Sequence, residues 1–232
     1  MTYWKPTVTV HQGDCLSLMR DMAVGGFDAV ITDPPYGTGA RRRKKSGDMT
    51  SLTTLRAQWD VWDVRWVYHA APLLGEGGKI VSFCPVQLSG DLVEAAARCG
   101  LPFICSLHWI KPNPAPHFDG HLSNAIEHMM VFGTGPLNAH LDKNTFTTAP
   151  EQQRHKHENH KPVDLMRWVV RLVSPPRGWV LDPFCGSGST LVAAALEERN
   201  AVGVELDPDH AAAAFQEAKT VAQPKLDLPP AQ

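Results

Sequence analysis

Short apolar runs rich in β-branched residues recur along the chain at intervals that leave room for a helix between most consecutive runs. Runs of roughly four to eight such residues, bounded by polar, glycine or proline positions, are typical of buried β-strands. The expected strands lie at residues 7–10, 29–32, 79–83, 103–110, 129–132, 179–181 and 201–204.

Helix-like segments fill the intervals between these runs, and the last two of them are rich in Ala and Glu, which favour helix. Strands that alternate with helices predict an α/β fold with a mainly parallel, doubly wound sheet. Trp59, Trp62 and Trp66, spaced by three and four, indicate one further amphipathic segment whose tryptophans belong to the core. The expected helices lie at residues 15–22, 88–99, 163–173, 190–198 and 209–221.

Stretches rich in polar residues or proline interrupt the alternation at residues 37–56, 111–119 and 137–161. Loops this long in a compact domain are usually functional or disordered. We expect one domain over residues 1–223, followed by a frayed tail at 224–232. The first stretch carries adjacent cations that would contact DNA phosphates, or else form a solvated loop: Arg41, Arg42, Arg43, Lys44 and Lys45.

Composition limits the class of protein further. The 232 residues are 43% hydrophobic and 20% charged, which suits one globular domain with a sizeable core. The formal net charge is −2, so any nucleic-acid contact must come from a local basic patch. Because the apolar runs are all shorter than the roughly 20 residues of a membrane helix, we expect no membrane span.

Cysteine usage indicates a reducing compartment. The chain has 5 cysteines, an odd number, and they form no CxxC pair, which favours free thiols over disulfides or a zinc site. The first residues also lack the layout of a signal peptide, so we expect a cytoplasmic protein. His155, His157 and His160 lie close together, but their spacing fits no common zinc pattern, and we expect no metal.

The first candidate site follows an apolar strand. Asp33, Pro34, Pro35 and Tyr36 stand where the expected strand 29–32 ends, and ligands in open α/β sheets bind beyond such ends. A carboxylate and a proline carbonyl can accept the two hydrogens of an exocyclic base amine, whose lone pair is otherwise delocalised into the ring. Tyr36 offers a flat face to a base swung out of the duplex. The alternative is a rigid turn without chemistry.

The second candidate site is a glycine-rich turn between a strand and a helix. Gly186 and Gly188 allow a tight bend and a close approach of a ligand, and Ser189 or Thr190 can cap the helix that follows. The turn has no lysine for a phosphate-binding loop and no third glycine for a dinucleotide fingerprint. Glu205 ends the next expected strand, at the distance where an acid holds the ribose of an adenosine cofactor.

Together, the segment from Asp33 to Tyr36 and the segment 182–188 resemble motifs of the DNA N4-cytosine/N6-adenine methyltransferase family. The resemblance covers about residues 7 to 220, and the catalytic segment precedes the cofactor segment, as in the circularly permuted β class. It implies a circularly permuted Rossmann-like methyltransferase fold, mainly parallel with one antiparallel strand. This also explains why the glycine turn follows the sixth expected strand rather than the first.

The resemblance implies S-adenosyl-L-methionine as cofactor and double-stranded DNA as substrate. The catalytic residues would be Asp33, Pro34, Pro35 and Tyr36, with base flipping. The resemblance also implies that Asp14 approaches the adenine of the cofactor and that the segment from His160 to Pro162 contacts its methionine end. The implied cofactor-binding residues are Asp14, Cys15, Asp33, His160, Lys161, Pro162, Asp182, Pro183, Phe184, Gly186, Ser187, Gly188, Thr190, Glu205 and Leu206.

Target recognition in the family lies between the two motifs, which leaves residues 111–159 here, with Lys111 and Asn113 near the target base. This insert is short, so the target is expected to be short or relaxed, or else a second subunit of a homodimer helps to read it. The sequence does not indicate whether a restriction enzyme accompanies the protein.

Asp at the first position of the catalytic motif is commoner among the adenine enzymes of the family, so adenine N6 is the expected target. Cytosine N4 methylation and an RNA substrate remain the alternatives within enzymes. An inactive nucleic-acid-binding protein and a NAD-dependent enzyme are the more distant ones.

Overall fold

The computed structural model describes residues 4–37, 61–114, 123–138, 143–150, 160–222 and the strand at 225–227. The basic run Arg41 to Lys45 therefore lies outside the described residues, as do most of the stretch 37–56 and parts of 111–159. In the described residues, no helix has both the length and the apolar character needed to cross a membrane.

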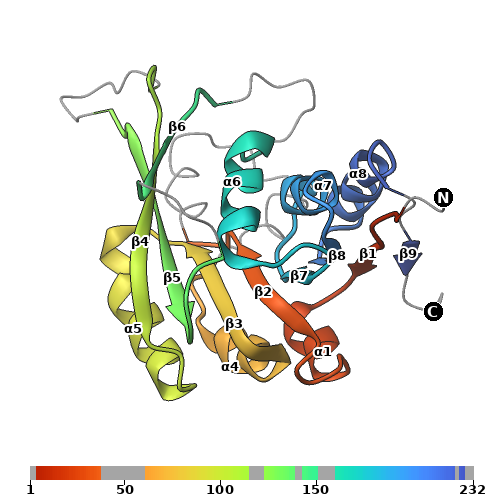
Figure 1. Ribbon diagram of the computed structural model, residues 1–232, viewed down its shortest axis with the longest axis horizontal. Coiled ribbons are helices and arrows are strands. Elements are labelled where there is room, and N and C mark those ends of the chain that lie inside the picture. The colour runs from red at the N-terminus through yellow and green to blue at the C-terminus, as the bar shows by residue number, and fades with distance from the viewer. Residues whose placement is uncertain are drawn as a thin grey trace, which may run out of the picture.

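The described strands form one nine-stranded sheet in the order β6-β4-β5-β3-β2-β7-β8-β1-β9 (Figure 1). Of these strands, β5 alone runs antiparallel to its neighbours, β3 and β4, which confirms the predicted, mainly parallel sheet with one antiparallel strand. The strands are β1 (Val8–Gln12), β2 (Phe27–Thr32), β3 (Leu74–Phe83), β4 (Phe103–Ile110), β5 (Ile126–Gly133), β6 (Thr145–Thr147), β7 (Trp179–Asp182), β8 (Asn200–Glu205) and β9 (Lys225–Asp227).

Helices cover both faces of the sheet, as expected for a doubly wound fold (Figure 1). One set packs in a cluster with Val8, Ala29 and Ile31, and the other packs in a cluster with Val30 and Leu181. Ala29, Val30 and Ile31 alternate between the two clusters because successive strand residues point to opposite faces. The first set is α6 (Val163–Val173), α7 (Ser189–Leu196) and α8 (Pro208–Ala218), and the second is α1 (Cys15–Arg20), α4 (Arg65–Ala70) and α5 (Ser89–Arg98).

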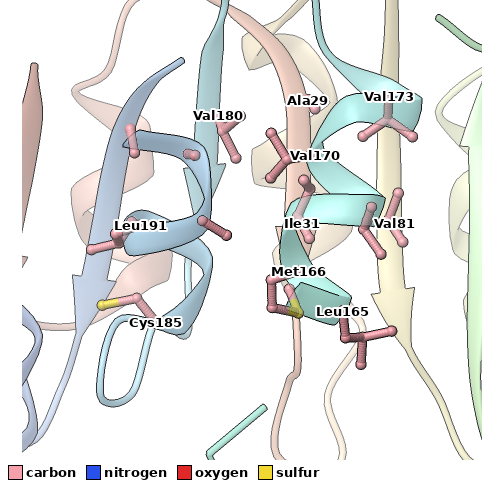
Figure 2. Packing of buried hydrophobic residues seen from close by; sticks show 14 of the residues in the cluster. Ala29, Ile31, Val81, Leu165, Met166, Val170, Val173, Val180, Cys185 and Leu191 are labelled. Carbon is pink, nitrogen blue, oxygen red and sulfur yellow. The ribbon is translucent and has the colours of Figure 1, made fainter. Parts of the chain in front are cut away.

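Helix α6 lies across the centre of the sheet and buries one apolar side. Figure 2 shows its side chains turned toward the strands β2 and β3, while Leu191 of α7, in the same cluster, lies apart from them, near Cys185. Nearly complete burial of such aliphatic side chains contributes roughly 1.5–3 kcal/mol each to folding. The residues labelled on this face are Leu165, Met166, Val170 and Val173 of α6 and Ala29, Ile31 and Val81 of the strands, all members of one buried cluster.

The position of β7 confirms the circular permutation. It is late in the chain, yet it lies in the middle of the sheet, between β2 and β8, where it pairs in parallel with both. The segment that carries Asp33 and the segment that carries the glycine turn therefore leave the sheet side by side at the same edge. Because β6 was not predicted, β7 is the seventh strand rather than the sixth.

Three local predictions need correction. Helix α4, with Trp66 fully buried, was expected only as an amphipathic segment, and the three-residue strands β6 and β9 were not expected. Ser189 and Thr190 do not cap α7, whose N-cap is Gly188 in a left-handed conformation without a side-chain cap. Thr190 is instead buried in the first helical turn, where its side chain is hydrogen-bonded to Asp182.

Candidate active site

Four neighbouring parallel strands end at one edge of the sheet and bring the two candidate sites together. The sheet order β2-β7-β8-β1 places the residues after β2, β7, β8 and β1 next to one another. Asp33 follows β2, Asp182 ends β7, Glu205 ends β8, and Gly13 follows β1. This edge is where an open α/β sheet binds its ligands.

A buried hydrogen bond joins the two motifs directly. The Thr32 hydroxyl on β2 donates to the Asp182 carboxylate on β7 over 2.8 Å. The same oxygen accepts the Phe184 N–H at 3.1 Å, and Asp182 is only 3% exposed. Burial raises the pKa of Asp182 to about 6, although these hydrogen bonds oppose the shift. The Asp182 carboxylate is therefore engaged in shaping the turn, and its contact with a cofactor stays a prediction.

The glycine turn is fixed to Glu205, as the sequence spacing predicts. Gly186 donates its N–H to Glu205 Oε2 over 2.9 Å, and Asp207 donates its N–H to Oε1 over 2.9 Å. Burial raises the pKa of Glu205, while these backbone donors oppose the rise. Gly186 has φ of +51°, and a Cβ placed on it would meet no atom of the described residues within 4 Å. The space beside Glu205 is thus open at the turn.

Gly188 has a different role from Gly186. Its φ is +91°, and a Cβ on it would lie 3.0 Å from the Ala214 Cα of α8. The missing side chain therefore allows α8 to pack closely against the turn. The absent side chain of Gly188 therefore makes room for α8 and not for a ligand. Gly186, whose Cβ would point into open space, is the glycine that fits the expected close approach of a ligand.

The segment after β1 lies beside Glu205. Gly13 donates its N–H to the Glu205 carbonyl over 2.8 Å. Asp14 caps α1 by accepting the Ser17 N–H at 2.9 Å. Cys15 is buried in the core, and burial together with Asp14 raises the pKa of its thiol to about 12. The Leu206 carbonyl accepts a hydrogen bond from Gln12 at 3.1 Å.

Asp33 and Tyr36 lie close together at the end of β2. The Tyr36 hydroxyl donates to Asp33 Oδ1. Burial, followed by the nearby Asp33 charge, raises the pKa of Tyr36, so its phenol stays protonated at neutral pH. The Tyr36 ring lies 6.3 Å from the Trp62 ring, centroid to centroid, at 35°. Between Asp33 and Tyr36 in the chain, Pro34 is buried and Pro35 is half-buried.

Lys161 lies at the Asp33 carboxylate. Its Nζ is 2.6 Å from Asp33 Oδ2 and 3.1 Å from Glu127 Oε2, and it stands 4.6 Å above the Phe83 ring. Burial lowers the pKa of Lys161, but the two carboxylates outweigh it, and the net shift is upward. The resemblance places Lys161 at the methionine end of the cofactor, and the structure adds a direct link to the catalytic motif.

Glu127 on β5 is a site residue that the sequence reasoning missed. It pairs with Lys161 and also with Lys111, whose Nζ lies 2.5 Å from Glu127 Oε1 and 4.8 Å above the Trp109 ring. Lys111 was expected at DNA, and the described structure places it against this carboxylate. A charged residue within the apolar strand 126–133 was the available signal.

Several of the remaining candidates lie in the glycine turn or in the segment just before α6, and the others lie elsewhere. The His160 Nδ1 and the Ser187 Oγ lie 2.7 Å apart, which links the segment before α6 to the glycine turn. Pro162 is the N-cap of α6, and Phe184 packs edge-on to Trp66 at 6.2 Å. Pro183, next to Phe184, lies in the same turn and is buried. Asn113 lies just beyond β4, two residues after Lys111, and its contact with DNA stays a prediction. His155 and His157 lie outside the described residues.

Comparison with known proteins identifies relatives of this arrangement. The sequence profile of the DNA methylase family matches residues 27–216. Type II methyltransferase M2.MboI of Moraxella bovis is 23% identical, over 84% of this chain and 82% of its own length. Type II methyltransferase M2.LlaDCHI of Lactococcus lactis subsp. cremoris is 22% identical, over 90% of this chain and 88% of its own.

Two solved structures share the fold. The M1.HpyAVI–SAM complex superposes with a TM-score of 0.70 at 23% identity, covering 90% of this chain and 98% of that one. The PvuII DNA methyltransferase, described as cytosine-N4-specific, superposes with a TM-score of 0.68 at 16% identity, covering 96% and 97%. The predicted methyltransferase fold is thus confirmed.

Proposed function

The chain belongs to the DNA methylase family, whose members act on adenine N6 or cytosine N4, and we propose that it methylates adenine N6. The methyl group comes from S-adenosylmethionine, and the substrate is double-stranded DNA. The observation that carries the proposal is the adjacency of Asp33 to the glycine turn. The hydrogen bond from Thr32 to Asp182 fixes the two motifs at neighbouring strand ends.

The residues at the sheet edge fit S-adenosylmethionine. The space above Gly186 is open, and the Glu205 carboxylate lies beside it with lone pairs left for ribose hydroxyls after two backbone donors. Asp14 would approach the adenine, and His160, tied to Ser187, would approach the methionine end. These assignments rest on the resemblance together with the placement of the side chains.

The protein's own groups would prepare the base amine. S-adenosylmethionine supplies a methyl group on a sulfonium centre when bound. Asp33 and the Pro34 carbonyl would accept the two amine hydrogens, which leaves the nitrogen lone pair aimed at the methyl group. The Asp33 carboxylate would take up the proton that the amine nitrogen loses on methylation. Developing positive charge on nitrogen is stabilised by the same carboxylate.

Asp at position 33 is the reason to favour adenine, since the adenine enzymes of the family more often carry it. Cytosine N4 is the second candidate, because a cytosine-N4-specific enzyme shares the fold at similar coverage. Both reactions need the same groups around an exocyclic amine, so the chemistry of the edge fits either base.

DNA contacts complete the proposal. Arg41, Arg42, Arg43, Lys44 and Lys45 would contact phosphates immediately after the catalytic turn, and residues 111–159 would read the target within one domain over residues 1–223. Because that insert is short, a relaxed target or a homodimer is expected.

The proposal is tested by incubating the protein with unmethylated double-stranded DNA and S-adenosylmethionine, digesting the DNA and separating the nucleosides by mass spectrometry. We expect N6-methyladenine. N4-methylcytosine alone would overturn the choice of base, and the absence of any methylated nucleoside would overturn the proposed function.

A further inference from the structure

We propose that Glu127 is a positioning residue of the active site: it holds the Lys161 ammonium group between two carboxylates, so that Asp33 remains able to receive the base amine. The proposal rests on the proposed function of Asp33. It concerns a strand residue with no place in either sequence motif.

Four charged side chains form a row with alternating sign. Lys111 pairs with Glu127 at 2.5 Å, Glu127 with Lys161 at 3.1 Å, and Lys161 with Asp33 at 2.6 Å. Glu127 gives one oxygen to each lysine: Oε1 to Lys111 and Oε2 to Lys161. The Lys161 ammonium is therefore shared between two acids, and its position is set from both sides.

Burial makes this sharing energetically important. The side chain of Lys161 is 12% exposed, and those of Asp33 and Glu127 are 24% and 25% exposed. Removing a charge from water is costly unless opposite charges and hydrogen bonds replace the lost hydration. The row contains two cations and two anions, so it balances as a unit. Loss of Glu127 would leave the two lysines with one carboxylate.

Glu127 is suited to fix this geometry because it lies inside the sheet. On β5 it pairs in register with Trp109 of β4, and two residues further along β5 the chain pairs with Phe83 of β3. The Phe83 ring lies under the Lys161 ammonium. Lys161, in contrast, belongs to the connecting segment just before α6. A strand residue thus anchors a loop residue.

The consequence for Asp33 follows from competition. Its Oδ2 faces Lys161 and its Oδ1 accepts from Tyr36, so the base amine has to share this carboxylate with both groups. Glu127 attracts the ammonium away from Asp33 and weakens that competition. Without the Glu127 charge, Lys161 would pair with Asp33 alone and would hold its oxygen more tightly against the incoming amine.

Loss of the Glu127 charge also lowers the proton affinity of Lys161. Burial lowers the pKa of Lys161, while the charges of Asp33 and Glu127 raise it. Among the described residues, the charged groups facing Lys161 are Asp33 from the end of β2, Glu127 from β5 and, behind Glu127, Lys111 from the end of β4. Replacing Glu127 by Gln removes one opposing acid, so the Lys161 pKa falls and its ammonium is lost at lower pH.

The test compares Glu127→Gln with Glu127→Asp, which keeps the charge on a shorter side chain. For Glu127→Gln we expect kcat to fall about tenfold or more, with the KM for S-adenosylmethionine nearly unchanged. The loss should diminish toward high pH, where Lys161 gives up its charge and no longer competes for Asp33. Glu127→Asp should keep kcat and its pH profile close to those of the wild type. Glu94→Gln, which removes an acid from an exposed ion pair with Arg98 on α5, is the matched control and should change neither quantity.

Competitive labelling of lysine amines with acetic anhydride across pH, read by peptide mass spectrometry, measures Lys161 without any assay of methylation. We expect Lys161 to become reactive at lower pH in Glu127→Gln than in the wild type or in Glu127→Asp. Identical labelling and identical kcat profiles would overturn the role of Glu127 while leaving the proposed function intact. Equal losses in both variants, with unmoved pH profiles, would reduce Glu127 to a purely structural role. A wild type that labels as expected but methylates no DNA would refute the proposed function instead.

Discussion

The Thr32 hydroxyl on β2 donates to the Asp182 carboxylate on β7 over 2.8 Å, although 150 positions separate the two residues in the chain. This bond connects the last residue of the catalytic strand to the last residue of the cofactor strand. Because Thr32 and Asp182 are both buried, neither group can exchange its partner for water. The bond therefore helps to hold the two halves of the site in register.

We predict that Thr32→Val lowers the free energy of unfolding by about 1–3 kcal/mol at pH 8, since a buried carboxylate loses a hydrogen-bond donor. Burial raises the pKa of Asp182 to about 6 from a model-peptide value of 3.8, so the ionised form is disfavoured in the folded state. Thr32 opposes that shift. The deficit of the variant should be complete well above the folded-state pKa of Asp182 and should shrink as the pH falls through about 6, because the carboxyl is then protonated in both folded proteins.

Urea unfolding at pH 5 and at pH 8 measures this difference. Thr9→Val, the same exchange on β1, is the control and should show no comparable dependence on pH. A Thr32→Val deficit that is equal at both pH values would mean that the hydroxyl does not stabilise the Asp182 charge.

We predict that Asp33→Ala abolishes methylation and leaves S-adenosylmethionine binding largely intact. The reason is that Asp33 lies on the catalytic half, and Glu205 and the glycine turn remain in place. Lys161 keeps Glu127 as a partner, so its charge stays compensated. Isothermal titration calorimetry measures the binding, and transfer of a tritiated methyl group measures the activity. Near-normal turnover would contradict the assigned role.

The two glycines of the turn should respond differently to substitution. Gly186→Asn, which tolerates a positive φ, should place a side chain in the open space and weaken S-adenosylmethionine binding about tenfold with little change in melting temperature. Gly188→Ala should instead lower the melting temperature, because its Cβ would lie 3.0 Å from the Ala214 Cα.

Calorimetry and thermal unfolding of both variants separate these effects. Unchanged affinity in Gly186→Asn would place the cofactor elsewhere. Unchanged stability in Gly188→Ala would mean that α8 shifts without strain.

Patterns local in sequence gave the correct framework. Apolar runs predicted the long strands, and the acid 19 residues after Gly186 is bonded to its N–H at 2.9 Å. Such features are predictable because strand periodicity and the strand–turn–helix–strand unit depend on neighbouring positions. The three-residue strands β6 and β9 could not be predicted this way, since they are too short to show a period.

Contacts between distant segments were beyond the sequence pattern. Nothing local to Lys161 indicates that it faces Asp33 and Glu127, which lie on separate strands. Likewise, the need for glycine at 188 arises from α8, whose packing against the turn is a tertiary contact. Thr190 resembles a helix cap in sequence, but the turn conformation at Gly188 places it inside the helix.

The basic run gives a prediction that depends on sequence alone, because it lies outside the described residues. Neutralising Arg41, Arg42 and Arg43 should weaken binding to all DNA sequences alike, since phosphate contacts do not read bases. The salt dependence of the affinity should fall by roughly one unit of slope per lost contact. Titrations at several salt concentrations measure the slope, and an unchanged slope would indicate a solvated loop without DNA contacts.

Single-molecule sequencing of DNA can determine whether this protein methylates adenine N6 and whether Asp33 is needed for it. The DNA should come from a host that lacks adenine methylation and expresses either the wild type or Asp33→Ala. We expect N6-methyladenine in a short, recurring sequence context with the wild type and none with the variant. Methylation only at cytosine N4, or equal adenine methylation with both proteins, would contradict this expectation.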